Sequence, residues 1–177
     1  MSASLPPVTF VLGGARSGKS LYAETLMDGY TAKIYLATAE AMETEGDDEM
    51  KARIEEHRER RGPEWQTIEE PLALAVWLTA HSDPALPVLV DCLTLWLSNA
   101  MAAGRDVDGD IRALMDALKS CAAPVILVSN EVGQGIVPDN ALARAYMDNA
   151  GRLNQAVAAA ADRVVVMHAG LAHVLKD

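Results

Sequence analysis

The octapeptide Gly13–Ser20, GGARSGKS, constrains the fold of this chain more than any other stretch, because it matches the phosphate-binding pattern G-x-x-x-x-G-K-[ST]. The apolar stretch 8–12 before it predicts a β-strand, and a helical pattern from Lys19 to about Asp28 follows it. Glycines let backbone N–H groups point inward around phosphate oxygens, and the following helix turns its positive N-terminal end toward them. This strand–loop–helix context predicts that the chain binds a nucleoside triphosphate.

The motif also predicts individual roles. The Lys19 ammonium is expected to reach the β- and γ-phosphates, which makes Lys19 a candidate catalytic residue, and the Ser20 hydroxyl is expected to bind Mg²⁺. The alternative, a glycine-rich turn without chemical meaning, does not account for a Lys-Ser pair placed between a strand and a helix. The predicted nucleotide-binding residues of the motif are Gly13, Gly14, Ala15, Arg16, Ser17, Gly18, Lys19 and Ser20.

Strand and helix patterns alternate along the rest of the chain. Strands are predicted at 33–37, 65–69, 88–91, 124–129, 163–167 and 171–175, and helices at 46–61, 72–81, 93–103, 108–121 and 140–161. Most of these strands are continuous apolar runs, which favours a mostly parallel sheet with helices on both faces, and the last two predict an antiparallel edge hairpin. With 177 residues and no repeat or linker, the chain is predicted to be one α/β domain, 1–177, of the P-loop NTPase class.

Charge and cysteine content disfavour several classes of protein. The formal net charge of −10 argues against binding to nucleic acid, which usually requires a basic surface. Cys92 and Cys121 lack metal-ligand spacing, so we expect two reduced thiols in a cytoplasmic protein. No apolar run approaches the length of a membrane span, and the N-terminus lacks the basic and apolar parts of a signal peptide.

Polar residues end several predicted strands, at the sheet edge where parallel α/β folds bind ligands. Asp91 ends an apolar strand and is the candidate second Mg²⁺ ligand. Capping the next helix is the alternative role for Asp91, and the two roles are compatible. Asn130-Glu131 shares only its Asn with the guanine-binding pattern N-K-x-D, which disfavours a GTPase switch. For this pair, a substrate-binding role and a purely structural strand end both stay open.

Positive charge is concentrated in the predicted helix 46–61, where five of the 15 Lys and Arg residues fall between Lys51 and Arg61. His57 lies among these arginines. Composition alone favours an ordinary exposed helix whose arginines alternate with glutamates. The alternative is chemical, since a neutral imidazole can attack phosphorus and form a covalent nucleotidyl intermediate. Adjacent guanidinium groups would favour the neutral imidazole and stabilise charge on the transferred group.

Five segments carry a resemblance to a known family. In chain order they are GGARSGKS, DDEMKARIEEHRERRG, VDCLTLWLSN, SNEVGQGIVP and AGRLNQAVAAAAD. Together they resemble the bifunctional adenosylcobinamide kinase/adenosylcobinamide-phosphate guanylyltransferases of cobalamin biosynthesis, over nearly the whole chain from Val8 to about Lys176. The resemblance implies a RecA-like P-loop sheet with an antiparallel edge, and an assembly of homo-oligomers, typically trimers.

Two reactions are implied by this resemblance. In the first, ATP or GTP phosphorylates the aminopropanol hydroxyl of adenosylcobinamide. In the second, GTP transfers GMP to a histidine, which passes it to adenosylcobinamide phosphate to give adenosylcobinamide-GDP. The matching histidine is His57, so the resemblance reverses the preference for an ordinary helix. Its neighbour Glu56 stands where some relatives have a second histidine, which leaves His57 as the single candidate carrier.

The same matching implies further site residues. Residues 37–39 would lie near the nucleotide, 58–61 would follow the phosphates, and two acidic positions would complete the site, with Mg²⁺ at Ser20 and Asp91. Beyond the motif, the predicted site residues are His57, Ala37, Thr38, Ala39, Arg58, Glu59, Arg60, Arg61, Glu69 and Asp91. Two rival functions stay open: a plain P-loop small-molecule kinase in which His57 is incidental, and a nucleotide-dependent interaction protein that transfers no group.

Overall fold

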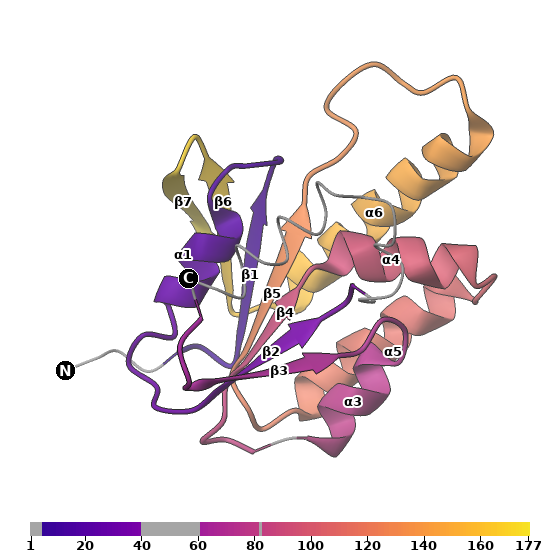
Figure 1. Cartoon of the computed structure of the whole chain (residues 1–177). Coiled ribbons are helices and arrows are strands. Elements are labelled where there is room, and N and C mark those ends of the chain that lie inside the picture. The colour runs from indigo at the N-terminus through magenta and orange to yellow at the C-terminus, as the bar shows by residue number, and fades with distance from the viewer. Residues whose placement is uncertain (1–4, 40–60, 82) are drawn as a thin grey trace.

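The strands of the fold follow the apolar segments of the sequence. A computed structural model describes residues 5–39, 61–81 and 83–177, and within them one seven-stranded sheet has the order β3-β2-β4-β5-β1-β6-β7 (Figure 1). Neighbouring strands are parallel except β6 and β7, which pair antiparallel, so the predicted sheet with its antiparallel edge is confirmed. The strands are β1 (Val8–Gly13), β2 (Lys33–Ala37), β3 (Trp65–Glu69), β4 (Val88–Asp91), β5 (Val125–Asn130), β6 (Arg163–His168) and β7 (Leu171–Lys176).

Helices cover the two faces of the sheet unequally (Figure 1). Helix α1 packs on one face, and α3, α4, α5 and α6 pack on the other. The described helices are α1 (Lys19–Thr25), α3 (Leu74–Ala80), α4 (Leu93–Ala102), α5 (Val107–Ser120) and α6 (Ala141–Ala160). The predicted helix 46–61 lies outside the described residues except for Arg61, which is not helical.

Most side chains of the central strands are apolar because both faces of these strands are buried. On β5, Val125 and Leu127 pack in the core under the four helices, whereas Ile126 and Val128 pack in the core under α1. Successive side chains of a strand point to opposite faces, so a strand covered on both sides shows no polar alternation. All six residues of β7, by contrast, are exposed, as expected for an edge strand.

Two helix boundaries differ from the sequence prediction by more than one residue, each for a local reason, and the other boundaries of the described helices agree to within one residue. Helix α3 begins at Leu74 rather than Leu72, because the Glu70 Oε1 atom accepts hydrogen bonds from the backbone N–H groups of Leu72 and Ala73. These two residues form the turn before the helix. Helix α1 ends at Thr25 rather than Asp28, since the backbone N–H groups of Met27 and Asp28 donate to carbonyl oxygens three residues back instead of four.

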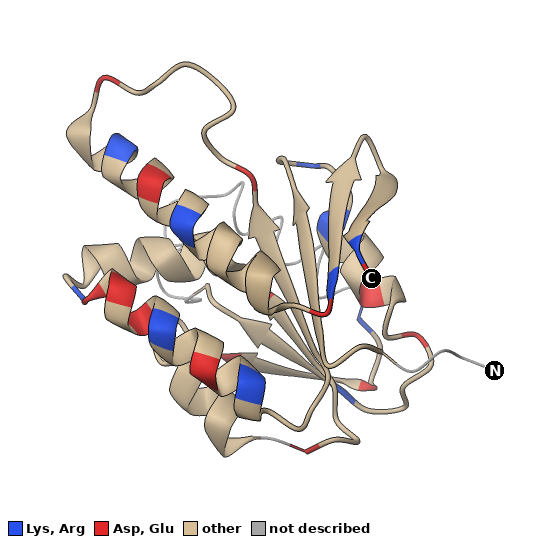
Figure 2. Ribbon diagram, turned by 180° about the vertical axis from the view of Figure 1, so that it is seen from behind, with Lys and Arg blue, Asp and Glu red and all other residues tan. Residues whose placement is uncertain are grey.

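The outer surfaces of α5 and α6 carry charges of both signs in alternation (Figure 2). Arg152 Nε on α6 lies 3.7 Å from Asp108 Oδ1 on α5, and Asp106 caps α5 by accepting from the Gly109 N–H at 3.1 Å. Exposed ion pairs contribute only about 0–1 kcal/mol each, so these charges solvate the surface and the two apolar cores hold the fold.

Candidate active site

The phosphate-binding loop joins β1 to α1 and has the backbone geometry that its glycines allow. Gly18 is the N-cap of α1 and has φ +90°, a conformation that favours glycine. At Gly13, an added methyl group would lie 2.8 Å from the carbonyl oxygen of Met167 on β6 and would also run into Ser17 Oγ. Glycine is therefore required at both ends of the turn, at one for its φ angle and at the other for space.

Lys19 is held against the loop that it is predicted to serve. Its Nζ donates to the carbonyl oxygen of Gly14 at 3.0 Å, and the side chain is 9% exposed. Ser17 is two residues before it, with a buried Oγ that has no hydrogen-bond partner among the described residues. A buried hydroxyl without a partner is rare, and a polar atom in this state inside a phosphate-binding loop is suited to an incoming phosphate oxygen.

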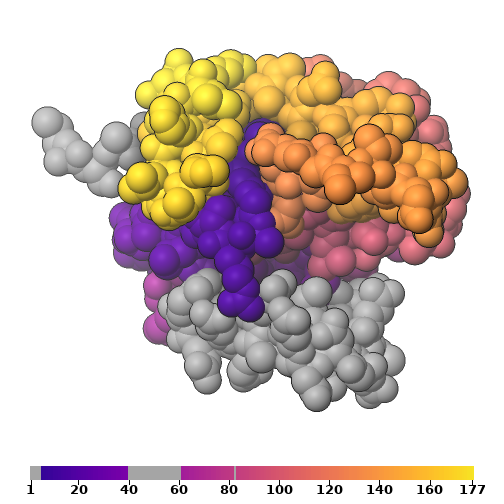
Figure 3. Space-filling view, turned by 90° about the horizontal axis from the view of Figure 1, so that it is seen from above, coloured from indigo at the N-terminus to yellow at the C-terminus, as the bar shows by residue number. Residues whose placement is uncertain are grey.

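The hairpin of β6 and β7 supports this loop from the side. The backbone N–H of Gly170, in the turn of the hairpin, donates to the carbonyl oxygen of Ser17 at 3.1 Å. Figure 3 shows the indigo loop between the yellow hairpin on one side and the orange segment that follows β5 on the other. Sequence reasoning did not connect the hairpin with the site, although its turn, His168-Ala-Gly170, was predicted.

Three of the predicted residues lie side by side at one edge of the sheet. Ala37 at the end of β2 pairs with Glu69 on β3 and with Asp91 on β4. The two acidic residues therefore flank one strand end, and the site at this edge is acidic. The N-cap residue of α4 is Cys92 rather than Asp91, so the capping alternative for Asp91 is wrong.

Thr38 joins the ends of β2 and β4. Its buried hydroxyl donates to the Cys92 carbonyl oxygen at 2.8 Å and accepts from the Cys92 N–H at 3.0 Å. Its carbonyl oxygen accepts from Asn99 Nδ2 at 2.8 Å. Thr38 thus fixes the backbone next to Asp91, and Ala39, which follows it, is half-buried.

Tyr35 links two predicted site residues and was missed by sequence reasoning. Its hydroxyl donates to Asp91 Oδ2 at 2.9 Å, and the Arg61 guanidinium carbon lies 3.5 Å from the centre of its ring. Burial raises the pKa of Tyr35 well above its usual value, and the negative charge of Asp91 adds to this shift. Tyr35 is therefore a protonated hydrogen-bond donor at neutral pH. The only signal in the sequence was a tyrosine inside an apolar strand.

Four of the predicted residues, His57, Arg58, Glu59 and Arg60, lie outside the described residues. Arg61 is described, and besides the ring of Tyr35 it contacts β3, where its Nη1 donates to Thr67 Oγ1 at 3.4 Å. The last arginine of the basic segment thus lies against β2 and β3, the strands that end in Ala37 and Glu69.

Two polar groups near the site serve the fold. Asn130 Nδ2 donates to Thr94 Oγ1 at 2.9 Å, which ties the end of β5 to α4 and favours the structural interpretation of Asn130. Burial, together with the nearby charge of Asp91, raises the pKa of the Cys92 thiol, so this cysteine is protonated at neutral pH.

The residues present fit a magnesium ion that binds together with a nucleotide. Ser20 offers a hydroxyl in the first turn of α1, and Asp91 offers a carboxylate at the end of β4. Within the described part of the chain, no three His, Cys, Asp or Glu side chains are grouped so that they could hold a metal by themselves. Mg²⁺ commonly takes one or two protein oxygens and completes its shell with phosphates and water.

None of the described helices is both long and apolar enough to cross a lipid bilayer.

Comparison with known proteins finds relatives over nearly the whole length of the chain. Residues 9–175 match the family "Cobinamide kinase / cobinamide phosphate guanyltransferase". The bifunctional adenosylcobalamin biosynthesis protein CobP of Pseudomonas aeruginosa is 48% identical over 169 residues, covering 94% of this chain and 95% of the relative. The bifunctional adenosylcobalamin biosynthesis protein CobU of Salmonella typhimurium is 40% identical over 181 residues, covering 94% of this chain and 98% of the relative.

A solved structure supports the fold. The flagellar accessory protein FlaH of Methanocaldococcus jannaschii superimposes with a TM-score of 0.52 at 12% identity, over 97% of this chain and 79% of that protein. At this identity the likeness concerns the P-loop NTPase fold alone. The family match spans nearly every described element, and the chain therefore belongs to the cobinamide kinase/cobinamide phosphate guanyltransferase family.

Proposed function

We propose that this protein phosphorylates adenosylcobinamide with ATP or GTP, and then transfers GMP from GTP to adenosylcobinamide phosphate in adenosylcobalamin biosynthesis. The observation that carries the proposal is the family match over residues 9–175, in a chain whose phosphate-binding loop has the glycine geometry, the held lysine and the unpartnered buried serine hydroxyl described above. ATP and GTP are its substrates, and adenosylcobinamide and its phosphate are its small-molecule partners.

For the kinase step, the loop and the sheet edge supply positioning and charge. The backbone N–H groups of residues 14–19 would surround the β- and γ-phosphates, and Lys19 would exchange the Gly14 carbonyl for phosphate oxygens. Ser20 and Asp91 would hold Mg²⁺, which when bound neutralises charge on the phosphates. The hydroxyl oxygen of adenosylcobinamide attacks the γ-phosphorus, the bond to the β-phosphate oxygen breaks, and the hydroxyl proton is released.

For the guanylyl step, we propose His57 as the carrier of GMP. An imidazole nitrogen of His57 attacks the α-phosphorus of GTP, and pyrophosphate leaves with the electrons of the broken P–O bond. A phosphate oxygen of adenosylcobinamide phosphate then attacks the same phosphorus, which releases the imidazole and forms adenosylcobinamide-GDP. Arg58, Arg60 and Arg61 would stabilise charge along the phosphates, with Glu59 among them and Ala37, Thr38, Ala39 and Glu69 bordering the nucleotide.

Labelling of the protein tests the guanylyl step directly. Protein incubated with Mg²⁺ and GTP labelled at the α-phosphate is expected to gain an acid-labile, alkali-stable label, as a histidine phosphoramidate would. In His57→Ala this label is expected to disappear while phosphorylation of adenosylcobinamide continues. Full α-labelling of His57→Ala would refute the assignment of His57, and a comparable loss of kinase activity would refute the division of roles.

The same experiment separates the rival functions. A plain small-molecule kinase would transfer only the γ-phosphate to an acceptor and would take no α-label. A nucleotide-dependent interaction protein would show neither transfer. The cytoplasmic location, the absence of nucleic-acid partners and the trimeric assembly stay predictions of the sequence and its resemblance.

A further inference from the structure

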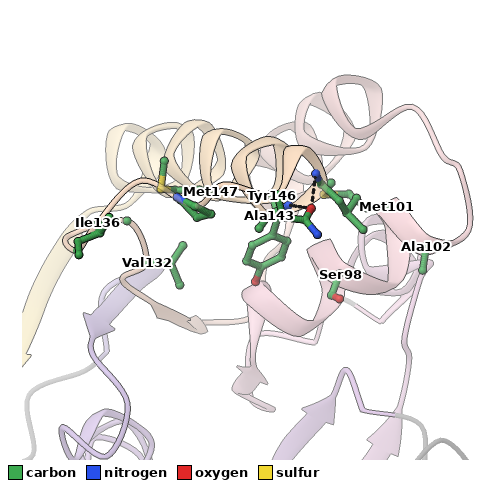
Figure 4. Close-up of a pocket in the computed structure, with 13 residues that line it drawn as sticks. Ser98, Met101, Ala102, Val132, Ile136, Ala143, Tyr146 and Met147 are labelled. Atoms are coloured by element: carbon green, nitrogen blue, oxygen red, sulfur yellow. Dashed lines mark hydrogen bonds between the residues drawn. The ribbon is translucent and has the colours of Figure 1, made fainter.

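An apolar pocket lies between α4, α6 and the segment 131–140 that joins β5 to α6. Its volume is about 730 Å³, within the range of about 300–1,000 Å³ that is typical of small-molecule sites. Figure 4 shows Val132 and Ile136 at one side of the pocket, Ser98 and Ala102 at the other, and Tyr146 between them. The lining offers few polar side chains, so it suits a large ligand with broad apolar surfaces and no net negative charge where it touches the protein.

The segment 131–140 that closes the pocket is unusual in length and in exposure. It spans ten residues, whereas connections of this kind in α/β folds commonly have about 2–6, and longer ones are often functional. Ile136 is 97% exposed, and Val137 and Leu142 are also exposed. Apolar side chains gathered at the mouth of a concave, apolar surface mark a site that another molecule covers.

One rim of the pocket is attached to the phosphate-binding loop. Gly13 on β1 pairs in register with Asn130 on β5, and the next backbone N–H, that of Glu131, donates to the Gly13 carbonyl oxygen at 3.1 Å. Val132 and Gly133, the following residues, line the pocket. Figure 3 shows the orange segment against the indigo loop. A ligand seated in the pocket therefore borders the loop at which the γ-phosphate is proposed to lie.

The other walls are fixed by specific contacts, so the pocket has a defined shape. Gly133 has φ +95°, and a methyl group there would lie 2.8 Å from Met147 Cγ on α6. Asn140 caps α6 through Oδ1, which accepts from the N–H groups of Leu142 and Ala143 at 2.8 and 3.2 Å. The hydroxyl of Tyr146 donates to the Thr94 carbonyl oxygen at 2.9 Å, which leaves the tyrosine ring to face the pocket.

We propose that this pocket binds the corrin ring of the acceptor, adenosylcobinamide, and presents its hydroxyl to the phosphate-binding loop. The assignment rests on the proposed function. A corrin ring is a broad macrocycle with methyl-covered faces and uncharged amide side chains, which matches an apolar lining with a few polar groups at its edge. A nucleoside triphosphate matches it poorly, because the lining residues include no Lys or Arg to meet its phosphates.

Substitutions on α6 test the assignment with a matched control. Ala143→Trp places an indole in the pocket, whereas Ala145→Trp adds the same ring to an exposed position of the same helix that is not among the lining residues. Equilibrium dialysis with adenosylcobinamide, which is coloured, measures binding without turnover. We expect the dissociation constant and the KM of adenosylcobinamide to rise at least about tenfold in Ala143→Trp only. The KM of ATP and the α-labelling by GTP, which involve no acceptor, are expected to change less than about twofold in both variants.

Several outcomes would overturn the proposal. Near-ultraviolet circular dichroism shows whether Ala143→Trp is folded. If the folded variant binds adenosylcobinamide normally, the pocket is excluded as the acceptor site. A raised KM for ATP or GTP in place of the acceptor would assign the pocket to the nucleotide. A change in mass by light scattering with normal acceptor binding would assign it to contact between copies of the chain. If wild-type protein takes the α-label but does not bind adenosylcobinamide, the assignment of adenosylcobinamide as the ligand of the pocket is refuted. If wild-type protein does neither, the proposed function itself is refuted.

Discussion

The two sides of the proposed active site are built in different ways. At the phosphate-binding loop and the neighbouring ends of β2 and β4, polar groups are held by bonds of 2.8–3.0 Å, as in Lys19 to Gly14, Thr38 to Cys92 and Tyr35 to Asp91. At the pocket between α4 and α6, the lining is mostly apolar and several side chains at its mouth are exposed. One side is organised by hydrogen bonds and charge, and the other by shape.

This difference sets the size of effect to expect from substitutions. Leaving a buried polar group without its partner costs about 1–3 kcal/mol or more, and the loss is larger for charged groups. A change of one methylene group in an apolar pocket costs about 1–3 kcal/mol at most and leaves related ligands acceptable. We call the side held by hydrogen bonds the bonded side. Substitution of a charged group there should therefore slow both reactions, whereas substitutions on the apolar side should alter the affinity for one substrate.

The largest effect is expected for Lys19→Ala. Its ammonium is the proposed neutraliser of phosphate charge in both reactions, so we expect kcat/KM to fall about 10²–10³-fold for the kinase and for α-labelling. Binding of adenosylcobinamide by dialysis is expected to be unchanged, since the pocket does not include Lys19. Steady-state kinetics with each nucleotide measure the first effect. A selective loss of acceptor binding would show that the two sides are not separate.

Sequence reasoning predicted the backbone setting of the phosphate-binding loop because the motif is defined by residue type at fixed spacing. Gly13, Gly18 and Lys19 belong to a motif whose backbone geometry is local, and the structure places them at a strand end and a helix N-terminus as predicted. The apolar strands β2 and β4 were predicted at their observed bounds, since burial on both faces leaves a continuous apolar signal.

The rest could not be predicted for reasons that are also physical. A strand with both faces buried does not reveal which face Tyr35 takes, so its bond to Asp91 was invisible in the sequence. The pocket depends on how Gly133 approaches Met147 on another element, which no local pattern encodes. The role of Gly170 against Ser17 is likewise a contact between distant parts of the chain.

A smaller effect is expected for Tyr35→Phe, which removes one hydrogen bond from the bonded side and leaves the aromatic ring in place. Loss of the hydrogen bond to Asp91 should lower the free energy of unfolding by about 1–2 kcal/mol at neutral pH, as measured by urea denaturation. Tyr30→Phe, partly buried against the same core, is the matched control. An equal loss in both variants would show that the bond to Asp91 contributes nothing specific.

The raised pKa of Tyr35 predicts that the stability of the wild-type protein depends on alkaline pH in a way that the stability of Tyr35→Phe does not. The unfolded tyrosine ionises near pH 10, while the folded one keeps its proton to higher pH. The stabilisation is therefore full below about pH 10 and is lost as the pH rises toward the pKa of the folded state. Wild-type protein should lose stability above pH 10 more steeply than Tyr35→Phe, and parallel alkaline curves would contradict this account.

The smallest effect, and the one with an unusual sign, is expected for Ser17→Ala. Ser17 Oγ is buried and has no hydrogen-bond partner in the described part of the chain, so its removal should leave the nucleotide-free protein equally stable or more stable by about 0.5–1 kcal/mol. Ser129→Ala is the matched control, because Ser129 is also buried but its Oγ donates to Asn154 Oδ1 at 2.7 Å. Its loss should lower the free energy of unfolding by about 1 kcal/mol.

Stability measured with bound nucleotide tests whether the Ser17 hydroxyl contacts a phosphate. If Ser17 Oγ bonds a phosphate oxygen, saturating Mg²⁺ and ATP should stabilise wild-type protein more than Ser17→Ala, and reduce or reverse the advantage of the variant. Thermal melts with and without nucleotide measure both differences. A variant that is less stable without nucleotide, by as much as Ser129→Ala, would show that the hydroxyl already has a partner within the protein. An advantage that persists unchanged with nucleotide would instead remove Ser17 Oγ from the phosphate site and leave the bonded side with one group fewer.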